Sequence, residues 1–115
     1  KSFEYSGMRE LDFSSAIRLE MIGEESFLCC SLLHRVIFPL NLKLLDKGAF
    51  QRCAKLTEID LSLATKLAAI GEAAFSYSSS LKTVKLPSNL TAIEQGAFEG
   101  CVKLAHIVFL ESMSL

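Results

Sequence analysis

The chain has 115 residues, enough for one domain, and half of them are hydrophobic, which is a high share for a small water-soluble domain. With 12 basic and 13 acidic residues the net charge is close to zero, so no overall field favours nucleic acid or an anionic membrane surface. The segment most similar to a membrane span, residues 27–45, carries charged residues and a proline, whereas a span needs roughly 20 nearly uncharged residues. We therefore expect no nucleic-acid partner and no membrane insertion in this segment.

A short pattern recurs along the chain at nearly fixed spacing. Its first column is Phe27, Phe50, Phe75 and Phe98, with gaps of 23, 25 and 23 residues. Three and six residues later come Cys30, Cys53, Ser78, Cys101 and Leu33, Leu56, Leu81, Leu104. Nine and eleven residues later come Val36, Ile59, Val84, Ile107 and Phe38, Leu61, Leu86, Phe109. Matched columns at one period predict a solenoid, in which each repeat buries its apolar side by stacking on the next. The phenylalanines should then lie in single file.

Each repeat is predicted to contain one short strand, because its apolar residues alternate with polar ones. In chain order the five strands are expected near residues 11–13, 36–38, 59–61, 84–86 and 107–109. Equivalent strands should run parallel, about 4.8 Å apart. Pro39 and Pro87 follow two of the strands and should stop them, because proline lacks the N–H that continues a ladder. The units without proline are two residues longer.

A second apolar pair follows each strand: Leu42/Leu45, Leu67/Ile70 and Leu90/Ile93. The three-residue spacing predicts a short extended or helical-turn segment on the opposite side of the coil. The glycines that follow, Gly71 and Gly96, are expected at bends with positive φ. We read residues 1–115 as a single domain of about four and a half repeats of 23–25 residues, and expect it to be part of a longer protein.

These columns resemble the BspA-type leucine-rich repeat from about residue 9 to 110. The matching motifs are Ile-Gly-x-x-Ala-Phe at 70–75, Gly-Ala-Phe-x-x-Cys at 96–101 and Leu-x-x-Val-x-Leu-Pro at 81–87. Ser78 departs from the pattern by replacing a cysteine, and Ser26, Ser62 and Leu110 replace an alanine and two prolines. The resemblance implies an α/β leucine-rich-repeat solenoid, or horseshoe, of stacked parallel short strands with turn or short helical segments on the convex side. It also implies an extracellular or cell-surface location, as in bacterial and unicellular eukaryotic proteins that bind host or matrix proteins, and no catalytic motif.

The cysteines and histidines do not have the spacing of a metal or catalytic site. Cys30 and Cys53 share one repeat position and should be small buried fillers, while Cys29, off register, is the candidate reactive thiol. His34 and His106 should lie about 14 Å apart, three strand spacings, so they cannot share a metal. Neither a nucleophile elbow nor a phosphate-binding glycine loop is present. We therefore expect no metal, no cofactor and no enzyme activity.

The outward positions beside the strand cores form two columns: Glu10, Arg35, Glu58, Thr83, His106 and Asp12, Ile37, Asp60, Lys85, Val108. Side chains in one column should reach those of the next repeat, so a Glu10–Arg35–Glu58 charge ladder and an Asp60–Lys85 pair are expected. One interpretation is a solvated face with weak ion pairs, each under about 1 kcal/mol. The other is a partner-binding concave face made by Arg35, Ile37, Glu58, Asp60, Thr83, Lys85, His106 and Val108.

Asn89-Leu90-Thr91, in the turn after Pro87, matches the N-glycosylation acceptor pattern. The alternative interpretation is an ordinary turn-forming sequence with no modification. At the two ends of the stack, further repeats, a cap or other chains should cover the exposed apolar edges.

The sequence predicts a non-catalytic protein-interaction or adhesion module with a protein partner. The alternative is a structural subunit or fragment packed inside a larger multi-chain assembly, which would allow an intracellular location. A third hypothesis is a repeat segment attached to an enzyme, and no group of catalytic residues in the sequence supports it.

Overall fold

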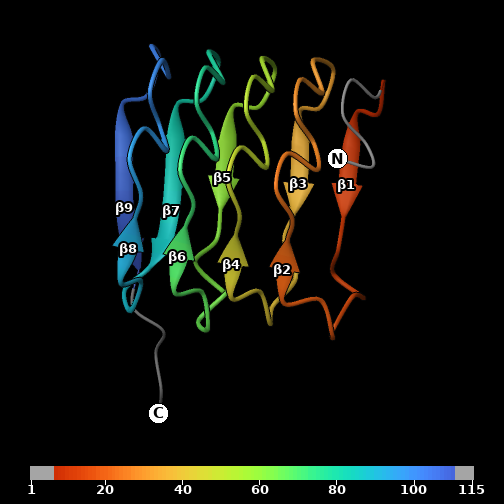
Figure 1. Cartoon of the computed structure of the whole chain (residues 1–115), viewed down its shortest axis with the longest axis vertical. Coiled ribbons are helices and arrows are strands. Elements are labelled where there is room, and N and C mark those ends of the chain that lie inside the picture. Colours follow the sequence, from red (N-terminus) through yellow and green to blue (C-terminus); the bar gives the residue numbers. More distant parts are fainter. Residues whose placement is uncertain (1–6, 111–115) are drawn as a thin grey trace.

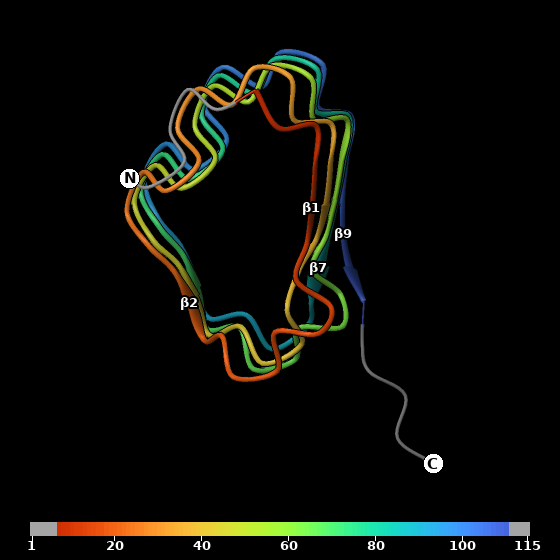
Figure 2. The same cartoon turned by 90° about the vertical axis from the view of Figure 1, so that its right-hand side faces the viewer.

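A computed structural model describes residues 7–110, and within this range it contains nine short strands and no helix. The chain winds into a parallel-strand solenoid of about four turns, seen end-on in Figure 2. One side of the coil carries β1 (Glu10–Asp12), β3 (Arg35–Ile37), β5 (Glu58–Asp60), β7 (Thr83–Pro87) and β9 (His106–Leu110). The opposite side carries β2 (Met21–Ile22), β4 (Leu44–Leu45), β6 (Ala69–Ile70) and β8 (Ala92–Ile93). Figure 1 shows the two sets running in opposite directions, each set internally parallel.

The five predicted strands are confirmed, although each begins one residue earlier than expected. The second segment of each repeat is a two-residue strand, so the extended form of the prediction is the correct one. The short helical segments that the resemblance implied do not occur within residues 7–110. Two apolar residues in extended backbone satisfy their N–H and C=O groups in the ladder of the next coil, so no helical turn is needed.

The phenylalanine column forms a single file through the core, as the repeat spacing predicted. Ring centroids are 5.1 Å apart for Phe27 and Phe50, 5.7 Å for Phe50 and Phe75, and 5.5 Å for Phe75 and Phe98. The interplanar angles are 12°, 7° and 5°, so the rings are stacked in parallel. Because the repeat translates each ring onto the next, the stack is a direct consequence of the sequence period.

The cysteine column links consecutive coils through hydrogen bonds. The thiols of Cys53 and Cys101 donate to the carbonyls of Phe27 and Phe75, at 3.2 and 3.1 Å. Ser78, which departs from the family pattern, donates its hydroxyl to the Phe50 carbonyl at 3.0 Å. Its oxygen also accepts the backbone N–H of Cys53 at 3.2 Å. Serine is tolerated here because a small buried side chain with one donor satisfies the position.

Long and short repeats turn the chain by different means. In the long coils, Asp12 and Asp60 accept the backbone N–H of the residue two positions later, at 2.8 and 3.0 Å, which forms an Asx turn. In the short coils a proline lies at the end of the strand. Pro39 comes two residues after β3, but Pro87 is the last residue of β7, so the expectation that Pro87 follows its strand is wrong. The asparagine two residues after each proline reaches back to the preceding coil. Asn41 Nδ2 donates to the Ile17 carbonyl at 2.6 Å, and Asn89 Nδ2 donates to Thr65 in the same way. The alternation of repeat lengths thus alternates aspartate turns with proline–asparagine turns.

Two positions of each repeat, two residues before and two after the phenylalanine, have left-handed backbone. They are occupied by Glu25, Gly48, Ala73, Gly96 and by Cys29, Arg52, Tyr77, Gly100. The expected positive φ is confirmed at Gly96 but is wrong for Gly71, whose φ is not positive. A Cβ atom at Gly71 would lie 2.8 Å from the Leu45 carbonyl oxygen, so close approach of the neighbouring coil is what requires glycine there.

Candidate functional site

The predicted binding residues all lie on the face formed by β1, β3, β5, β7 and β9, on the right in Figure 2. Buried Val36, Ile59 and Val84 alternate with them, so the predicted residues point outward. Arg35, Glu58, Asp60, His106 and Val108 are exposed, and Ile37, Thr83 and Lys85 are half-buried. Glu58, Thr83 and His106 are in register across three paired strands, as are Asp60, Lys85 and Val108. The structure therefore joins six of the eight residues in one continuous sheet.

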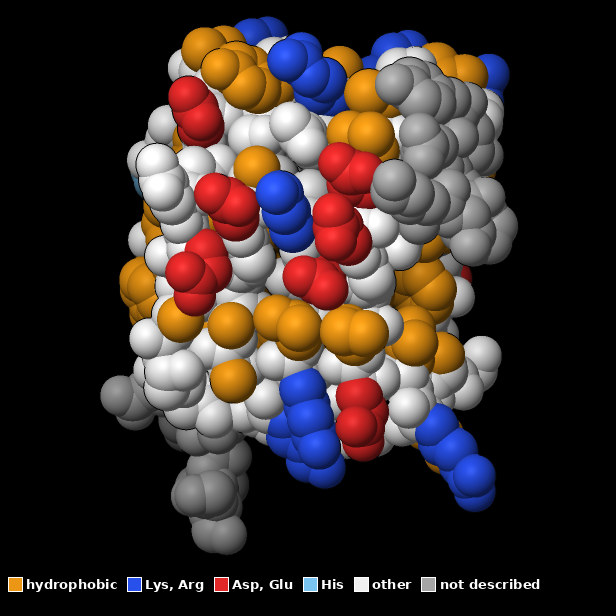
Figure 3. Space-filling model, in the orientation of Figure 1, with side chains coloured by type: hydrophobic (Ala, Val, Ile, Leu, Met, Phe, Trp, Pro, Cys, Tyr) orange, Lys and Arg blue, Asp and Glu red, His pale blue; other side chains and the backbone are white. Residues whose placement is uncertain are grey.

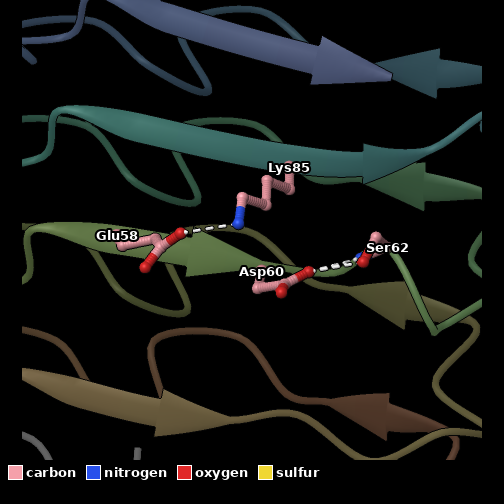
Figure 4. A network of polar contacts seen from close by, with 4 residues as sticks. All are labelled: Glu58, Asp60, Ser62 and Lys85. Atoms are coloured by element: carbon pink, nitrogen blue, oxygen red, sulfur yellow. Dashed lines mark hydrogen bonds and ion pairs between the residues drawn. The ribbon is translucent and has the colours of Figure 1, made fainter. Parts of the chain in front are cut away.

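The charges on this face pair differently from the expected ladder. Lys85 Nζ lies 3.2 Å from Glu58 Oε2, on the diagonal, rather than against Asp60 (Figure 4). Asp60 instead accepts hydrogen bonds from the backbone N–H and the hydroxyl of Ser62, at 3.0 and 2.6 Å. The expected Asp60–Lys85 pair is wrong because the turn after β5 engages the carboxylate first.

The expected Glu10–Arg35–Glu58 ladder is also not formed. Glu10 lies 3.8 Å from His34 Nε2, and Arg35 makes no ion pair with any residue in the described range 7–110. Hydrogen bonds from Ser14 lower the pKa of Asp12, and the charge of Arg35 on the neighbouring strand adds a smaller effect in the same direction.

The sheet on this face is interrupted between β3 and β5. Strand β1 pairs with β3, and β5 pairs with β7 and then β9, but no ladder joins β3 to β5 within the described part of the chain. On the opposite side β2, β4, β6 and β8 form one unbroken sheet. Figure 1 shows the wider interval between β3 and β5. We call this interruption the seam.

The seam leaves backbone groups without their ladder partners. In the parallel pattern that links the other coils, Val36 of β3 and Glu58 and Asp60 of β5 direct their N–H and C=O groups toward the missing neighbour. No backbone bond between these two strands is present in residues 7–110. Cα atoms of β3 and β5 still approach within 8 Å, which is less than the roughly 9.6 Å, two strand spacings, that an inserted strand would need.

A groove of about 620 Å³ lies over the seam. Its charged lining residues are Arg35, Glu58 and Asp60, and His34 lies beside them. Its apolar lining comprises Val36, Ile37, Phe38, Leu40, Leu61, Leu63 and Ala64, and Ser14 and Thr57 complete it. Four of the predicted binding residues, Arg35, Ile37, Glu58 and Asp60, therefore share one concave feature.

Two groove residues that the sequence reading missed are Leu40 and Leu63. They are 53% and 73% exposed, whereas Leu33, Leu56 and Leu81 of the core column are completely buried. They occupy equivalent positions in consecutive repeats, 23 residues apart, just after the strands. An exposed apolar residue outside the buried columns was the signal that could have identified them.

The opposite face differs in character. Figure 3 shows a row of apolar side chains along β2, β4, β6 and β8, with acidic side chains gathered beside it. Ion pairs connect adjacent coils there, at 3.5 Å between Lys43 and Glu20 and at 3.7 Å between Lys47 and Glu72. All four side chains are more than half exposed, so these pairs are worth little individually.

The cysteines behave as the repeat register predicts. Cys30, Cys53 and Cys101 are buried, Cys29 is half-buried, and all four are free thiols. Burial raises the pKa of Cys53 to about 12, and burial also raises that of Cys101. No group of three metal-ligating side chains is found in residues 7–110.

Asn89 and Thr91 of the glycosylation pattern both contact the preceding coil. Asn89 donates to Thr65, and the Thr91 hydroxyl donates to the Ala68 carbonyl at 2.8 Å. Both residues therefore have a structural role, which is to connect consecutive coils. Separately, none of the residues that the structure describes forms a helix with the length and hydrophobicity to cross a membrane.

The family model for the BspA type leucine rich repeat region, with 6 copies, matches residues 1–115, so the chain belongs to this family. Similar solved structures include a leucine rich cell surface protein from Faecalibacterium prausnitzii, with a TM-score of 0.71, 25% identity and 97% of this chain covered. A leucine-rich repeat protein from Bacteroides ovatus has a TM-score of 0.77, 28% identity and 88% coverage. A leucine rich repeat protein from T. pallidum has a TM-score of 0.72, 28% identity and 89% coverage.

The chain spans 32%, 25% and 56% of the lengths of these three proteins, in the same order. A search of curated proteins gives no match. Leucine-rich repeat domains are generally protein-interaction modules, and the family is generally non-enzymatic.

Proposed function

We propose that this chain is a non-catalytic protein-interaction module, used in adhesion at the cell surface or outside the cell. The observation that carries the proposal is the outward row of Glu58, Lys85, His106 and their neighbours, held in register on one solenoid face. A rigid ladder below the row presents these side chains in a fixed geometry, which lowers the entropy lost on binding. The similar protein from F. prausnitzii is described as a cell surface protein, which supports the location.

The mixed charge of this face suits a protein partner. Acidic Glu58 and Asp60 stand beside Lys85, with apolar Ile37 and Val108 at the two sides. Protein interfaces combine apolar contacts with a few polar groups that set orientation. Nucleic acid is not favoured, because the face has no concentration of positive charge.

The test is binding of the chain to a panel of purified extracellular-matrix proteins by surface plasmon resonance. Replacing Glu58 and Asp60 together with lysine should weaken capture about tenfold or more, since two favourable charge contacts become repulsive. Glu94→Lys, beside β8 on the other side of the coil, is the matched control and should bind as wild type. Equal loss in both variants, or no binding to any of the proteins, would contradict the proposal.

A second candidate, a structural subunit of a multi-chain assembly, is favoured by β9. Ile107 and Phe109 are 45% and 54% exposed, whereas their counterparts in the interior coils are at most 9% exposed. Sedimentation of the chain over a range of concentrations tests it. Association that is lost in the double variant Ile107→Ser and Phe109→Ser would support this candidate, and a monomer at all concentrations would contradict it.

A further inference from the structure

We infer that the seam groove binds an extended peptide segment of the protein partner, one with an aliphatic side chain close to a lysine or arginine. This inference rests on the proposed interaction function and assigns the part of the face that provides specificity. The groove is the place where the outward row, the unpaired backbone and exposed apolar side chains coincide.

The need for an aliphatic side chain in the peptide follows from the residues that line the groove just after β3 and β5. Leu40 and Leu63 come from consecutive coils, and both line the groove while more than half exposed. An aliphatic side chain placed between them would remove apolar surface from water on both sides, which favours binding. The aromatic lining residue Phe38 is only 6% exposed, so the groove offers no open ring face of the kind on which sugars stack. A peptide is therefore favoured over a glycan.

The basic residue follows from the charges that the fold leaves without an opposite partner. Of the charged residues that line the groove, Glu58 already has a partner in Lys85. Asp60 makes no ion pair with any described residue, and its carboxylate accepts hydrogen bonds from Ser62. A lysine or arginine placed beside Asp60 would complete the charge balance on the β5 wall. Arg35, on the β3 wall, would repel the same cation and so favour one placement of the peptide.

The extended conformation of the peptide follows from the backbone of β3 and β5, the two strands that form the walls of the groove. The N–H and C=O groups of Val36, Glu58 and Asp60 that the seam leaves unpaired offer hydrogen bonds along the strand direction. The seam is too narrow to admit a whole strand, so the peptide lies over it and reaches these groups directly or through water. In an extended peptide, side chains two positions apart share a face, about 7 Å apart. Lysine and leucine with one residue between them would thus both point into the groove.

The experiment titrates the isotope-labelled full chain with short serine-based peptides and follows its backbone amide resonances by NMR. The first peptide carries lysine and leucine two positions apart, the second has glutamate in place of lysine, and the third has serine in place of leucine. We expect the first to shift resonances of residues 34–40 and 57–64. The second and third should bind at least about fivefold more weakly, the loss expected for about 1 kcal/mol.

Variants locate the contacts. Asp60→Asn should remove the preference for lysine over glutamate, and Leu63→Ser should weaken both leucine-containing peptides about fivefold. Val102→Ser, at an 80% exposed aliphatic residue outside the groove, is the matched control and should change nothing. Shifts confined to residues 83–87 and 106–110 would overturn the groove assignment and leave the interaction function standing. Binding on no part of this face, together with no capture of matrix proteins, would contradict both. Equal binding of the lysine and glutamate peptides, or binding of a glycan panel in their place, would overturn the stated chemistry.

Discussion

The ring of Phe50 lies parallel to the ring of Phe75, with centroids 5.7 Å apart and planes inclined by 7°. Both side chains are completely buried, and each also stacks on the next ring of the file. Each ring therefore fills space in two repeats at once. Stability in this chain is shared between neighbouring coils rather than held within one of them.

Replacing Phe50 with alanine should lower the free energy of unfolding by about 3–5 kcal/mol, because the substitution leaves a cavity between two rings. Phe50→Leu should cost less, since most of the volume remains. Urea denaturation followed by circular dichroism measures both. A loss below about 1 kcal/mol for the alanine variant would show that the file does not support neighbouring coils.

Two neighbouring serines should respond oppositely to alanine. The buried Ser76 hydroxyl has no hydrogen-bond partner among the described residues, so Ser76→Ala should leave stability unchanged or raise it by about 1 kcal/mol. Ser78 bridges the Phe50 carbonyl and the Cys53 N–H, so Ser78→Ala should cost about 1–3 kcal/mol. Ser78→Cys, the family residue, is the control and should retain most of the stability. Matching effects at both sites would contradict the hydrogen-bond assignment.

Gly71 should not tolerate a methyl group. A Cβ atom there would lie 2.8 Å from backbone atoms of Leu45 and Asp46, which a side-chain rotation cannot relieve. Gly71→Ala should therefore destabilise the chain by about 2 kcal/mol or more, as overpacking does. Gly23→Ala is the comparison, because its nearest neighbour at 3.3 Å is the Ser26 hydroxyl, which can rotate. Thermal unfolding compares the two, and a larger loss at Gly23 would contradict the prediction.

Ala73 has left-handed backbone with φ of 57°, which costs an L-residue about 1 kcal/mol. Ala73→Gly should relieve that strain and raise stability by a few tenths to about 1 kcal/mol, after the greater flexibility of glycine in the unfolded chain is subtracted. The adjacent Ala74→Gly, where φ is not positive and the side chain is buried, should lower stability. Denaturation midpoints with unchanged slopes give the comparison, and a destabilised Ala73→Gly would contradict the strain.

Stability should fall at alkaline pH in a way that depends on Cys53. Burial raises its pKa from 9.0 to about 12, so the folded state binds the thiol proton more tightly than the unfolded state. The resulting contribution is complete below pH 9.0 and is lost as the pH rises toward about 12. Cys53→Ser removes this titration while tyrosine, lysine and the other thiols still titrate. The difference in unfolding free energy between wild type and variant should therefore shrink above pH 9, and a constant difference would show that the thiol is not desolvated.

The sequence alone determined the coil. The columns at Phe27, Cys30, Leu33 and Val36 repeat in size and polarity, and side chains of equal size at one period have to stack. The parallel strands, the ring file, the buried cysteines and the outward direction of Glu58 and Lys85 all followed from that period. The length of each strand and the extended form of the second segment depended on backbone pairing, which side-chain pattern does not specify.

The tertiary structure alone decided where the face is interrupted. Strand β7 follows β5 and β9 follows β7 without a break, although proline-terminated and proline-free repeats alternate there as they do at the seam. Phe38 packs edge-on against Phe50 much as Phe13 does against Phe27, yet β1 and β3 remain paired. Hydrogen bonds weaken steeply with small changes in distance and angle, whereas apolar packing tolerates such changes. A small displacement between β3 and β5 is therefore enough to remove the ladder, and the pattern of residue types does not predict so small a displacement. The groove forms where the ladder is missing.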